Sequence, residues 1–326
     1  MAGDEVAWSI RDALARRLEE RDRLILRILA THRLLTTHQI AELAFGSTVT
    51  ARHRMQILRG LQAVDRFRPR ADRGSHPGHF VLAPAGAVLV AEETGEDTRP
   101  AVRRARRDRA LATMPPTKLA HLLGVNGLHT ALIAHSRAHP DSRVLRWSTE
   151  RDLFVLGEPG DPDPYPRPDA IVTWREGAHR VTATIEYDTG TERLQRLIDK
   201  LALYTKLSAP NARHLRTLIH VHDDPILLFA FTTPGRETTA RTALTRAHPD
   251  IPVATGVWKQ GTSPAGPLWL PLNARPPRLR LAQLTPGAPD APSLFETGTT
   301  RAPGRTRFDA PSAADAWFDA DESDPW

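Results

Sequence analysis

Apolar residues in the first third of the chain recur with the spacing of amphipathic helices. The pattern predicts a long helix over residues 4–30. Its apolar side contains Leu24, Ile25, Ile28 and Leu29. A short helix is predicted over residues 38–45, because Thr36-Thr37 supplies an N-cap directly before it. A third helix follows over residues 48–63.

The third predicted helix separates an apolar side from a polar one. At 100° per residue, Ile57, Leu58 and Leu61 fall on one side of this helix. The opposite side presents Arg52, Gln56 and Arg59, with His53 beside them. Side chains on such a surface can enter the major groove of DNA, although a solvated helix face has the same pattern.

Two short strands are predicted after the third helix, over residues 67–69 and 79–83, with a basic loop between them. The arginines of this hairpin are Arg68, Arg70 and Arg73. Three helices followed by a basic hairpin are typical of a winged helix-turn-helix. We therefore expect residues 1–113 to form a DNA-binding domain with a charged linker, in which the hairpin arginines contact phosphates or the minor groove.

Beyond Met114-Pro-Pro, the pattern changes to that of a mixed α/β domain. Strands are predicted over residues 144–156, 167–174, 180–187, 215–221, 226–231 and 253–258. Helices are predicted over residues 118–139, with an interruption near 124–127, and over residues 191–207 and 237–248. We expect residues 114–270 to form a mixed sheet flanked by helices. Residues 271–326 are rich in Pro, Ala, Gly and Thr and are expected to be mostly disordered.

The composition limits the chemistry that the chain can perform. Its 326 residues contain no cysteine, which excludes disulfide bonds, cysteine-ligated zinc and a thiol nucleophile. No stretch approaches the roughly 20 apolar residues of a membrane helix, and the first residues lack the apolar core of a signal peptide. We expect a cytoplasmic protein without a membrane partner. A Walker-type phosphate loop is absent from the sequence, which disfavours an ATPase.

Charge is distributed unevenly along the chain. The net charge of +6 is small, but residues 1–120 contain 21 basic and 14 acidic residues, including an arginine cluster at 103–109. Residues 121–326 contain 23 basic and 24 acidic residues. A basic N-terminal part beside a neutral remainder indicates a polyanionic partner, most simply duplex DNA. Residues 315–326 contain five acids and no base and are expected to be a tail that competes with DNA for the basic surface.

Acidic residues stand at the ends of two neighbouring predicted strands. Asp169 opens one strand within Pro168-Asp169, and Glu186-Tyr187-Asp188 closes the next. Because side chains alternate along a strand, Glu186 and Asp188 share a face. With Asp169 they would form a carboxylate cluster, the ligand type that Mg²⁺ and Mn²⁺ prefer. The sequence thus predicts a metal site at Asp169, Glu186 and Asp188 that activates water and neutralises charge on a phosphodiester.

Three further residues belong to the same prediction. Lys200 is one of only four lysines and is expected to stabilise negative charge on the phosphate. It lies about nine residues into its helix, roughly 14 Å along the axis, so its reach depends on how the helix crosses the sheet. Glu150, at the end of the preceding strand, is a candidate fourth acid. Tyr204 shares a helix face with Lys200 and is expected to pack with a hydrogen-bonded hydroxyl.

This arrangement resembles the PD-(D/E)xK nucleases, in which a Pro-Asp strand and an acid-x-Lys strand build the metal site. More closely, residues 20–235 resemble the replication-relaxation family of actinobacterial and plasmid-borne proteins. The matching segments are Arg23 to Leu35, His121 to Asn126, Trp147 to Glu150, Pro168-Asp169, Glu186 to Thr191, and Lys200 to Tyr204.

The resemblance implies a two-domain α+β or α/β protein with an N-terminal winged helix-turn-helix and a restriction-endonuclease-like mixed sheet. It also implies a role in replication or relaxation of plasmid or other mobile DNA, with replication or conjugation proteins as partners. Asp169, Glu186, Asp188, Lys200 and Glu150 would form the catalytic site, with Mg²⁺ or Mn²⁺ as cofactor. A nuclease of this type has lysine two residues after the acid, where this chain has Asp188. Lys200, on the helix that follows, would take the place of that lysine. Winged helices often pair on palindromes, which makes a homodimer a further expectation.

Two other interpretations stay open at the level of sequence. The nuclease-like fold can be vestigial, leaving a regulator or adaptor that binds DNA without cutting it. Alternatively, His220-Val221-His222 has the form used by rolling-circle nickases, in which two histidines hold a metal and a tyrosine attacks. The tyrosines of the chain are Tyr165, Tyr187 and Tyr204. Leu207 stands where the Tyr-x-x-Lys spacing of such nickases requires lysine, which disfavours this second interpretation.

Overall fold

The computed structural model describes residues 16–69, 76–153, 166–208, 217, 225–247 and 249–284 of the chain. The chain divides into two compact units, each with a sheet of its own. Unit 1 comprises Met1–Arg137 and Gln260–Ser263, and unit 2 comprises Ala138–Lys259 and Pro264–Trp326. Within the described ranges, no helix combines the length and apolar character needed to cross a membrane.

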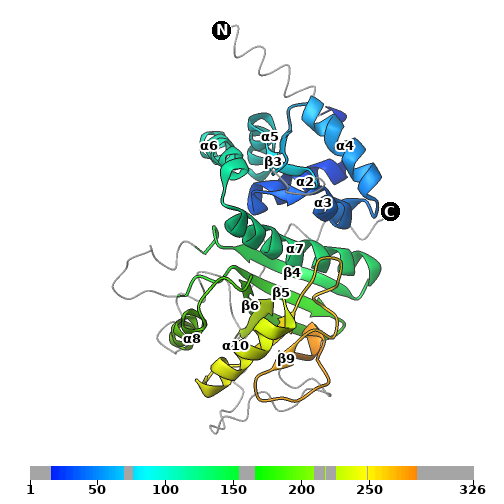
Figure 1. The fold of residues 1–326 in the computed structure, drawn as a ribbon. Helices are drawn as coiled ribbons and strands as arrows, with labels where there is room; N and C mark the ends of the chain where they lie inside the picture. The colour runs from blue at the N-terminus through cyan, green and yellow to red at the C-terminus, as the bar shows by residue number, and fades with distance from the viewer. Residues whose placement is uncertain are drawn as a thin grey trace. The chain divides into compact units, whose positions relative to one another are not determined.

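Unit 1 contains most of the helices (Figure 1). Its elements are α2 (Glu20–His32), β1 (Leu35–Thr36), α3 (Thr37–Ala44), α4 (Thr48–Gly60), β2 (Val64–Phe67), β3 (His79–Leu82), α5 (Pro84–Thr94), α6 (Thr98–Asp108), η1 (Arg109–Thr113) and α7 (Pro116–Ala138). The strands form an antiparallel sheet in the order β1-β3-β2. The predicted N-cap at Thr36 is confirmed, because its hydroxyl accepts a hydrogen bond from the Gln39 amide in a capping box.

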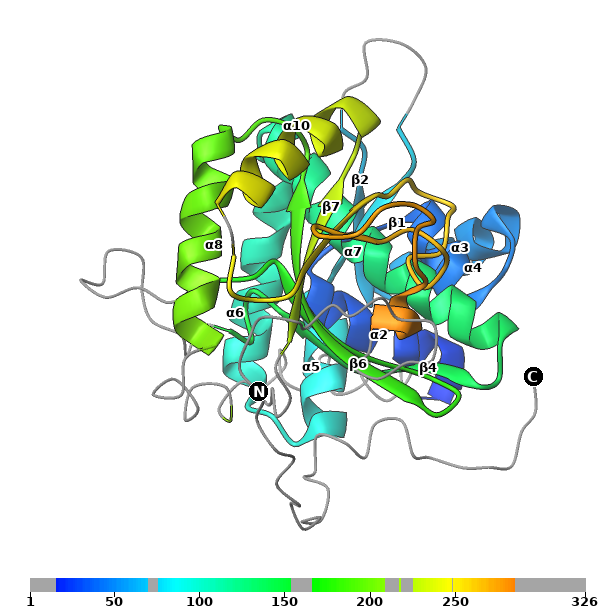
Figure 2. The ribbon, with the colours of Figure 1, turned by 90° about the horizontal axis from the view of Figure 1, so that it is seen from below.

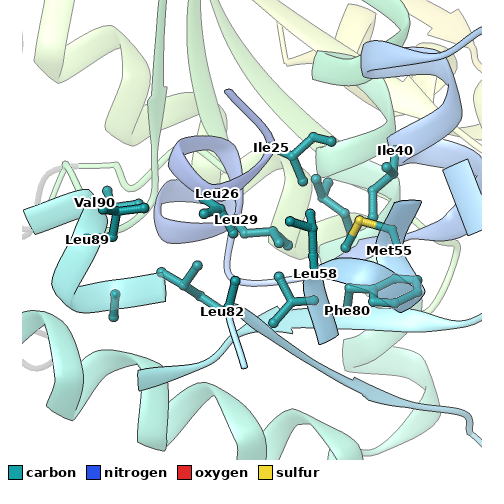
Figure 3. Packing of buried hydrophobic residues seen from close by; sticks show 14 of the residues in the cluster. Ile25, Leu26, Leu29, Ile40, Met55, Leu58, Phe80, Leu82, Leu89 and Val90 are labelled. Carbon is teal, nitrogen blue, oxygen red and sulfur yellow. The ribbon is translucent and has the colours of Figure 1, made fainter. Parts of the chain in front are cut away.

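The core of unit 1 lies between its helices and the small sheet. Figure 3 shows Leu29 of α2 close to Leu58 of α4, and Met55 of α4 close to Ile40 of α3. Phe80 of β3 belongs to the same cluster of buried side chains. Removing such apolar area from water stabilises the unit by roughly 25 cal/mol per Å². This packing fixes the orientation of α4 and therefore which of its side chains face outward.

The buried stripe of helix α4 overlaps the predicted apolar side at Leu58 but otherwise differs from it. Ala51, Met55 and Leu58 are its buried residues, whereas Ile57 is 38% exposed. The buried residues recur at the i, i+4, i+7 spacing of a helix that packs along one stripe, and Ile57 lies beside that stripe. The predicted polar side does face outward. Its exposed residues are Arg52, His53, Gln56 and Arg59.

Helix α7 is continuous, so the interruption predicted near residues 124–127 is wrong. Asn126, in the middle of that segment, is buried and anchored within unit 1. Its amide donates to the carbonyl oxygens of His32 at 3.0 Å and Leu34 at 2.6 Å, and its Oδ1 lies 3.0 Å from His32 Nδ1. These tertiary contacts offset the low helix propensity of the two glycines beside Asn126.

Unit 2 is built on a mixed six-stranded sheet in the order β4-β5-β6-β7-β8-β9. Its strands are β4 (Ser142–Thr149), β5 (Ala170–Glu176), β6 (His179–Asp188), β7 (Ile226–Phe231), β8 (Val253–Val257) and β9 (Leu270–Pro271). Pairing is antiparallel from β4 to β6, parallel from β6 to β8, and antiparallel between β8 and β9. The predicted mixed sheet is confirmed. Of the strand predicted over residues 215–221, only residue 217 lies within the described ranges.

Two helices of unit 2, α8 (Leu194–Ser208) and α10 (Pro234–Arg246), lie next to each other in both views (Figures 1 and 2). They bury apolar side chains against β7. The shared cluster includes Leu201 and Tyr204 of α8, Phe229 and Phe231 of β7, and Leu244 of α10. Because alternate residues of a strand share a face, α8 and α10 cover the same face of the sheet. Side chains on this face of β6 therefore meet α8 and α10.

The chain stays ordered beyond residue 271, where a disordered tail was expected to begin. Leu281–Leu284 forms the short helix η4, and Leu279, Leu281 and Leu284 are buried. Arg278 adds an ion pair to the buried Glu237 of α10, at 2.6 Å. Burial of these three leucines explains why the segment is ordered and not disordered as expected. A Pro-rich segment without such leucines would have little apolar surface to bury. Residues 285–326 lie outside the described part.

Candidate functional site

The candidate site lies where β5 begins and β6 ends. Ala170, the first residue of β5, pairs with Ile185 of β6, and the Asp169 amide donates to the Ile185 carbonyl at 3.0 Å. The Asp169 carboxylate accepts a hydrogen bond from the Tyr187 amide at 2.7 Å. Antiparallel pairing thus brings Asp169 and Glu186 to the same end of the sheet.

Glu186 is held by two side chains of α8. Lys200 Nζ donates to Glu186 Oε2 at 2.8 Å, and Tyr204 Oη donates to Glu186 Oε1 at 2.5 Å. Lys200 and Tyr204 are four residues apart and so lie on one side of the helix. Lys200 therefore reaches the acid despite its position well along α8. Its ammonium also lies 3.1 Å from Glu192 Oε2.

Burial and mutual charge control protonation at this site. Burial raises the pKa of Glu186 to about 7, and the negative charge of Asp169 adds to the increase, while Lys200 and Tyr204 oppose it. Burial alone would lower the pKa of Lys200, but attraction to Glu186, Asp169 and Glu192 raises it above its usual value. Burial also raises the pKa of the Tyr204 hydroxyl well above its usual value, and the charge of Glu186 adds to this. Lys200 is therefore charged and Tyr204 protonated at neutral pH, and Glu186 titrates near neutrality.

Asp188 shares the face of β6 that carries Glu186 but has different partners. Arg236, in the first turn of α10, donates to Asp188 Oδ2 from Nε at 3.1 Å and from Nη2 at 2.7 Å. The Gly190 amide donates to the other carboxylate oxygen. Arg236 Nη2 also donates to the Glu192 carbonyl at 2.6 Å. Asp188 and Arg236 together fix the turn that leads from β6 to α8.

Glu150 lies one residue beyond β4 and is exposed. The last pair of β4 and β5 joins Thr149 to Ala170, so Glu150 is at the same end of the sheet as Asp169. Across the described ranges, no three His, Cys, Asp or Glu side chains are grouped so that they could hold a metal ion. The structure therefore brings Asp169, Glu186 and Lys200 together, while Asp188 and Glu150 lie at the periphery.

The donor set that fits Mg²⁺ or Mn²⁺ best is the pair Asp169 and Glu186. Both are hard oxygen donors, and Asp169 lies close enough to raise the pKa of Glu186. A divalent cation would offset that repulsion, and Mg²⁺ is often bound by one or two carboxylates together with substrate phosphates. Both oxygens of Asp188 and both oxygens of Glu186 already accept hydrogen bonds, so a cation at either acid would have to displace a donor or share an oxygen with it. Asp188 is the weaker candidate of the two, because it is Glu186 whose pKa Asp169 raises.

Of the residues predicted to bind DNA, those that the structure describes gather on one side of unit 1. Those of α4 are exposed, and so is Arg68 directly after β2. The pKa of Arg66 is lowered by burial and by the positive charges of Arg68 and Arg59, so these guanidinium groups lie near one another. Arg70 and Arg73 lie outside the described residues, as do His220 and His222 of the rival nickase motif. The exposed stripe of α4 and the end of β2 thus form one basic surface.

Arg54 is the one arginine of α4 that faces the core, in contrast to the exposed Arg52 and Arg59. It turns inward, where its Nε donates to the buried Asp22 of α2 at 2.8 Å. Hydrogen bonding to Asp22 raises the pKa of Arg54. Among the described residues, Arg52 and Arg59 form no such ion pair. Their guanidinium groups are therefore available to an external anion.

Sequence reasoning missed two residues that shape the site in unit 2. Glu192 contacts Lys200, and Arg236 holds Asp188 from a separate helix. Nothing in the local pattern marks Arg236, because its partner lies on another element and the chain is rich in arginine. The prediction that Tyr204 packs with a hydrogen-bonded hydroxyl on the helix face of Lys200 is confirmed.

Comparison with protein families gives a match to the replication-relaxation model over residues 26–218. This match covers more than half of the chain. The chain belongs to the replication-relaxation family. Membership points to a role in replication or relaxation of mobile elements. Comparisons with curated proteins and with solved structures gave no significant match. In this replication-relaxation protein, the matched region includes the α4 surface as well as Asp169, Glu186 and Lys200.

Proposed function

We propose that this replication-relaxation protein binds duplex DNA through unit 1 and cuts a DNA phosphodiester bond at Asp169, Glu186 and Lys200 in the presence of Mg²⁺ or Mn²⁺. The observation that carries the proposal is the contact of Lys200 Nζ with Glu186 Oε2 at 2.8 Å, beside Asp169. Two acids and a lysine with a shifted carboxyl pKa are a combination that occurs at catalytic centres.

The DNA-binding part is supported by the order and exposure of elements in unit 1. Three helices, α2, α3 and α4, precede the β2–β3 hairpin, which is the order of a winged helix-turn-helix. The exposed side of α4 carries side chains suited to base edges and phosphates, namely Arg52, His53, Gln56 and Arg59. The arginines around β2 add charge beside α4. We assign docking on the major groove to α4.

In the proposed reaction, a water oxygen bonds to phosphorus while one P–O ester bond breaks and the leaving oxygen takes a proton. A divalent cation held by Asp169 and Glu186 would act as a Lewis acid on the phosphate and lower the pKa of a bound water. Groups of the chain itself orient the two acids and stabilise the phosphate. The Tyr187 amide orients Asp169, and the Tyr204 hydroxyl orients Glu186. The ammonium of Lys200 stabilises the negative charge that develops on the phosphate.

The test is cleavage of covalently closed plasmid DNA by the full chain, with Mg²⁺ or Mn²⁺ and with EDTA. We expect nicking with metal and none with EDTA. Asp169→Asn should abolish nicking and leave DNA affinity within about twofold of wild type, because Asp169 belongs to unit 2. Glu176→Gln is the matched control, since Glu176 is an acid at the opposite end of β5. Absence of cleavage of supercoiled, branched and single-stranded DNA with either metal would refute the catalytic part.

A second candidate function is a regulator or adaptor that binds DNA without cutting it. The observation that favours it is the full engagement of the acids. Both oxygens of Glu186 accept hydrogen bonds from α8, and both oxygens of Asp188 are engaged by Gly190 and Arg236. In that case, metal should leave bound DNA intact, and Asp169→Asn should change neither DNA binding nor plasmid topology.

A further inference from the structure

Helix α6 presents an unusual density of outward arginines. Of its eleven residues, the exposed arginines are Arg99, Arg103, Arg104, Arg106 and Arg107. The opposite side of the helix packs on unit 1 through Ala101 and Ala105, and the buried Asp108 pairs with Arg33 at 2.9 Å. Packing therefore explains one side of α6 but does not account for the arginines on the other side.

Several other arginines of unit 1 are neutralised by acids. On α2, Arg21, Arg23 and Arg27 pair with Glu19, Glu93 and Glu20. On α6, Arg104 pairs with Glu96 at 2.7 Å. Within the described part of the chain, the side chains of Arg99, Arg103, Arg106 and Arg107 form no ion pair. We call these four residues the α6 arginine face.

The spacing of the α6 arginine face places like charges next to one another. Arg99, Arg103 and Arg107 are successive i, i+4 neighbours, and Arg106 is three residues from Arg103. Like charges at these spacings destabilise an isolated helix. The face therefore opposes helix formation in the free protein, and an external polyanion would relieve the repulsion.

We propose that the α6 arginine face is a second, sequence-independent binding site for a nucleic-acid backbone. Arg99 and Arg107 are separated by roughly 12 Å along the helix axis, and each strand of a duplex places a phosphate at about every 3.4 Å of the DNA axis, so the face can contact more than one phosphate. The four residues are all arginines, which suit phosphate oxygens. The face contains no Gln, Asn or His, in contrast to α4, where Gln56 and His53 can read base edges.

The two surfaces of unit 1 lie apart. Figures 1 and 2 both show α6 and α4 on different sides of the unit, separated by α2 and α5. The end of α6 does reach β2, where Arg109 lies 3.1 Å from Asp65, but a duplex that contacts α4 would not reach the rest of α6. The inference rests on the DNA-binding part of the proposed function, and it adds that unit 1 holds a second DNA segment while α4 holds the first.

The experiment is a bridging assay with the full chain. One biotinylated duplex on beads captures the protein, and retention of a second, fluorescent duplex of unrelated sequence is measured at about 100 mM salt. In Arg103→Gln/Arg107→Gln, loss of two phosphate contacts should lower retention of the second duplex about tenfold or more. Binding of the first duplex should stay within about twofold. The variant should melt no lower than wild type, because a repulsion has been removed.

The matched control is Arg21→Gln/Arg27→Gln on α2, which removes the same charge from arginines already paired with Glu19 and Glu20. This control should retain the second duplex. Retention by the α6 variant equal to wild type would overturn the proposal, and so would equal losses in both variants. Higher retention of the second duplex by the α6 variant would assign the face to another anion, such as the acidic residues 315–326, and would also overturn it. If wild type binds no duplex at all, the DNA-binding part of the proposed function fails with it.

Discussion

Glu186 is a carboxyl group with almost no access to solvent, and its neighbours decide its charge. Lys200 and Tyr204 favour the carboxylate, whereas burial and Asp169 favour the protonated form. The pKa of about 7 is the balance of these effects. A group poised in this way can change its charge when a cation or a phosphate arrives, which a fully solvated glutamate would not do.

This balance predicts a pH-dependent stability. The pKa of Glu186 rises on folding from 4.5 to about 7, so between these values the folded protein keeps a proton that the unfolded chain has lost. The free energy of unfolding contributed by this group therefore decreases as pH rises through that window. In Glu186→Gln, which does not titrate, this decrease is absent. Relative to wild type, the variant should gain up to about 3 kcal/mol between pH 4.5 and pH 7.5.

Urea unfolding of both proteins in EDTA at several pH values measures the difference directly. Stability curves that run parallel across the whole window would show that Glu186 does not titrate as described.

At the scale of elements, the hypothesis that unit 1 docks on duplex DNA rests on the exposed surface of α4. Arg52 and Arg59 are exposed on α4, and among the described residues neither forms an ion pair, so each is available to a phosphate. Arg52→Ala/Arg59→Ala should weaken duplex binding and reduce the slope of log K against log salt by about two. Affinity measured by fluorescence anisotropy from about 50 to 200 mM salt checks this. An unchanged slope would identify both residues as a solvated helix face.

Helices and strands with a regular spacing of apolar residues were predictable from the sequence. Which of their residues are buried was less predictable. The mixed sheet and helix α8 follow from alternation and helical spacing, and the cap at Thr36 follows from local chemistry. The buried stripe of α4 differed because Ala51 and Met55, which carry weak apolar signals, face the core instead of Ile57. Helix α7 stayed continuous because Asn126 is anchored to α2, a tertiary contact that no local pattern contains.

The candidate site was predictable to the extent that strand pairing determines it. Alternation on β6 and antiparallel pairing with β5 are enough to join Asp169 and Glu186. The contact of Lys200 depends on where α8 crosses the sheet, and the contact of Arg236 with Asp188 depends on α10. Both depend on the packing of α8 and α10 against β7, which the sequence does not encode locally.

At the scale of the whole molecule, charge and chemistry are divided between two units. The basic surfaces of α4 and α6 belong to unit 1, and the acids with Lys200 belong to unit 2. We therefore expect binding and cleavage to be separable by mutation. Substitutions in unit 2 should affect the cleavage rate on DNA that is already bound, and substitutions on α4 should affect the amount of DNA bound.

The most direct measurement is the single-turnover rate at which saturating protein nicks supercoiled plasmid in Mg²⁺, compared between wild type and Lys200→Met. Loss of the ammonium beside Glu186 should lower the rate about 100-fold or more, with DNA affinity unchanged. Lys200→Arg, which keeps the charge, should retain part of the rate. The fold should survive in Lys200→Met, because Glu186 can take up a proton near neutral pH. Nicking by Lys200→Met at the wild-type rate would contradict the assignment of this site as the catalytic centre.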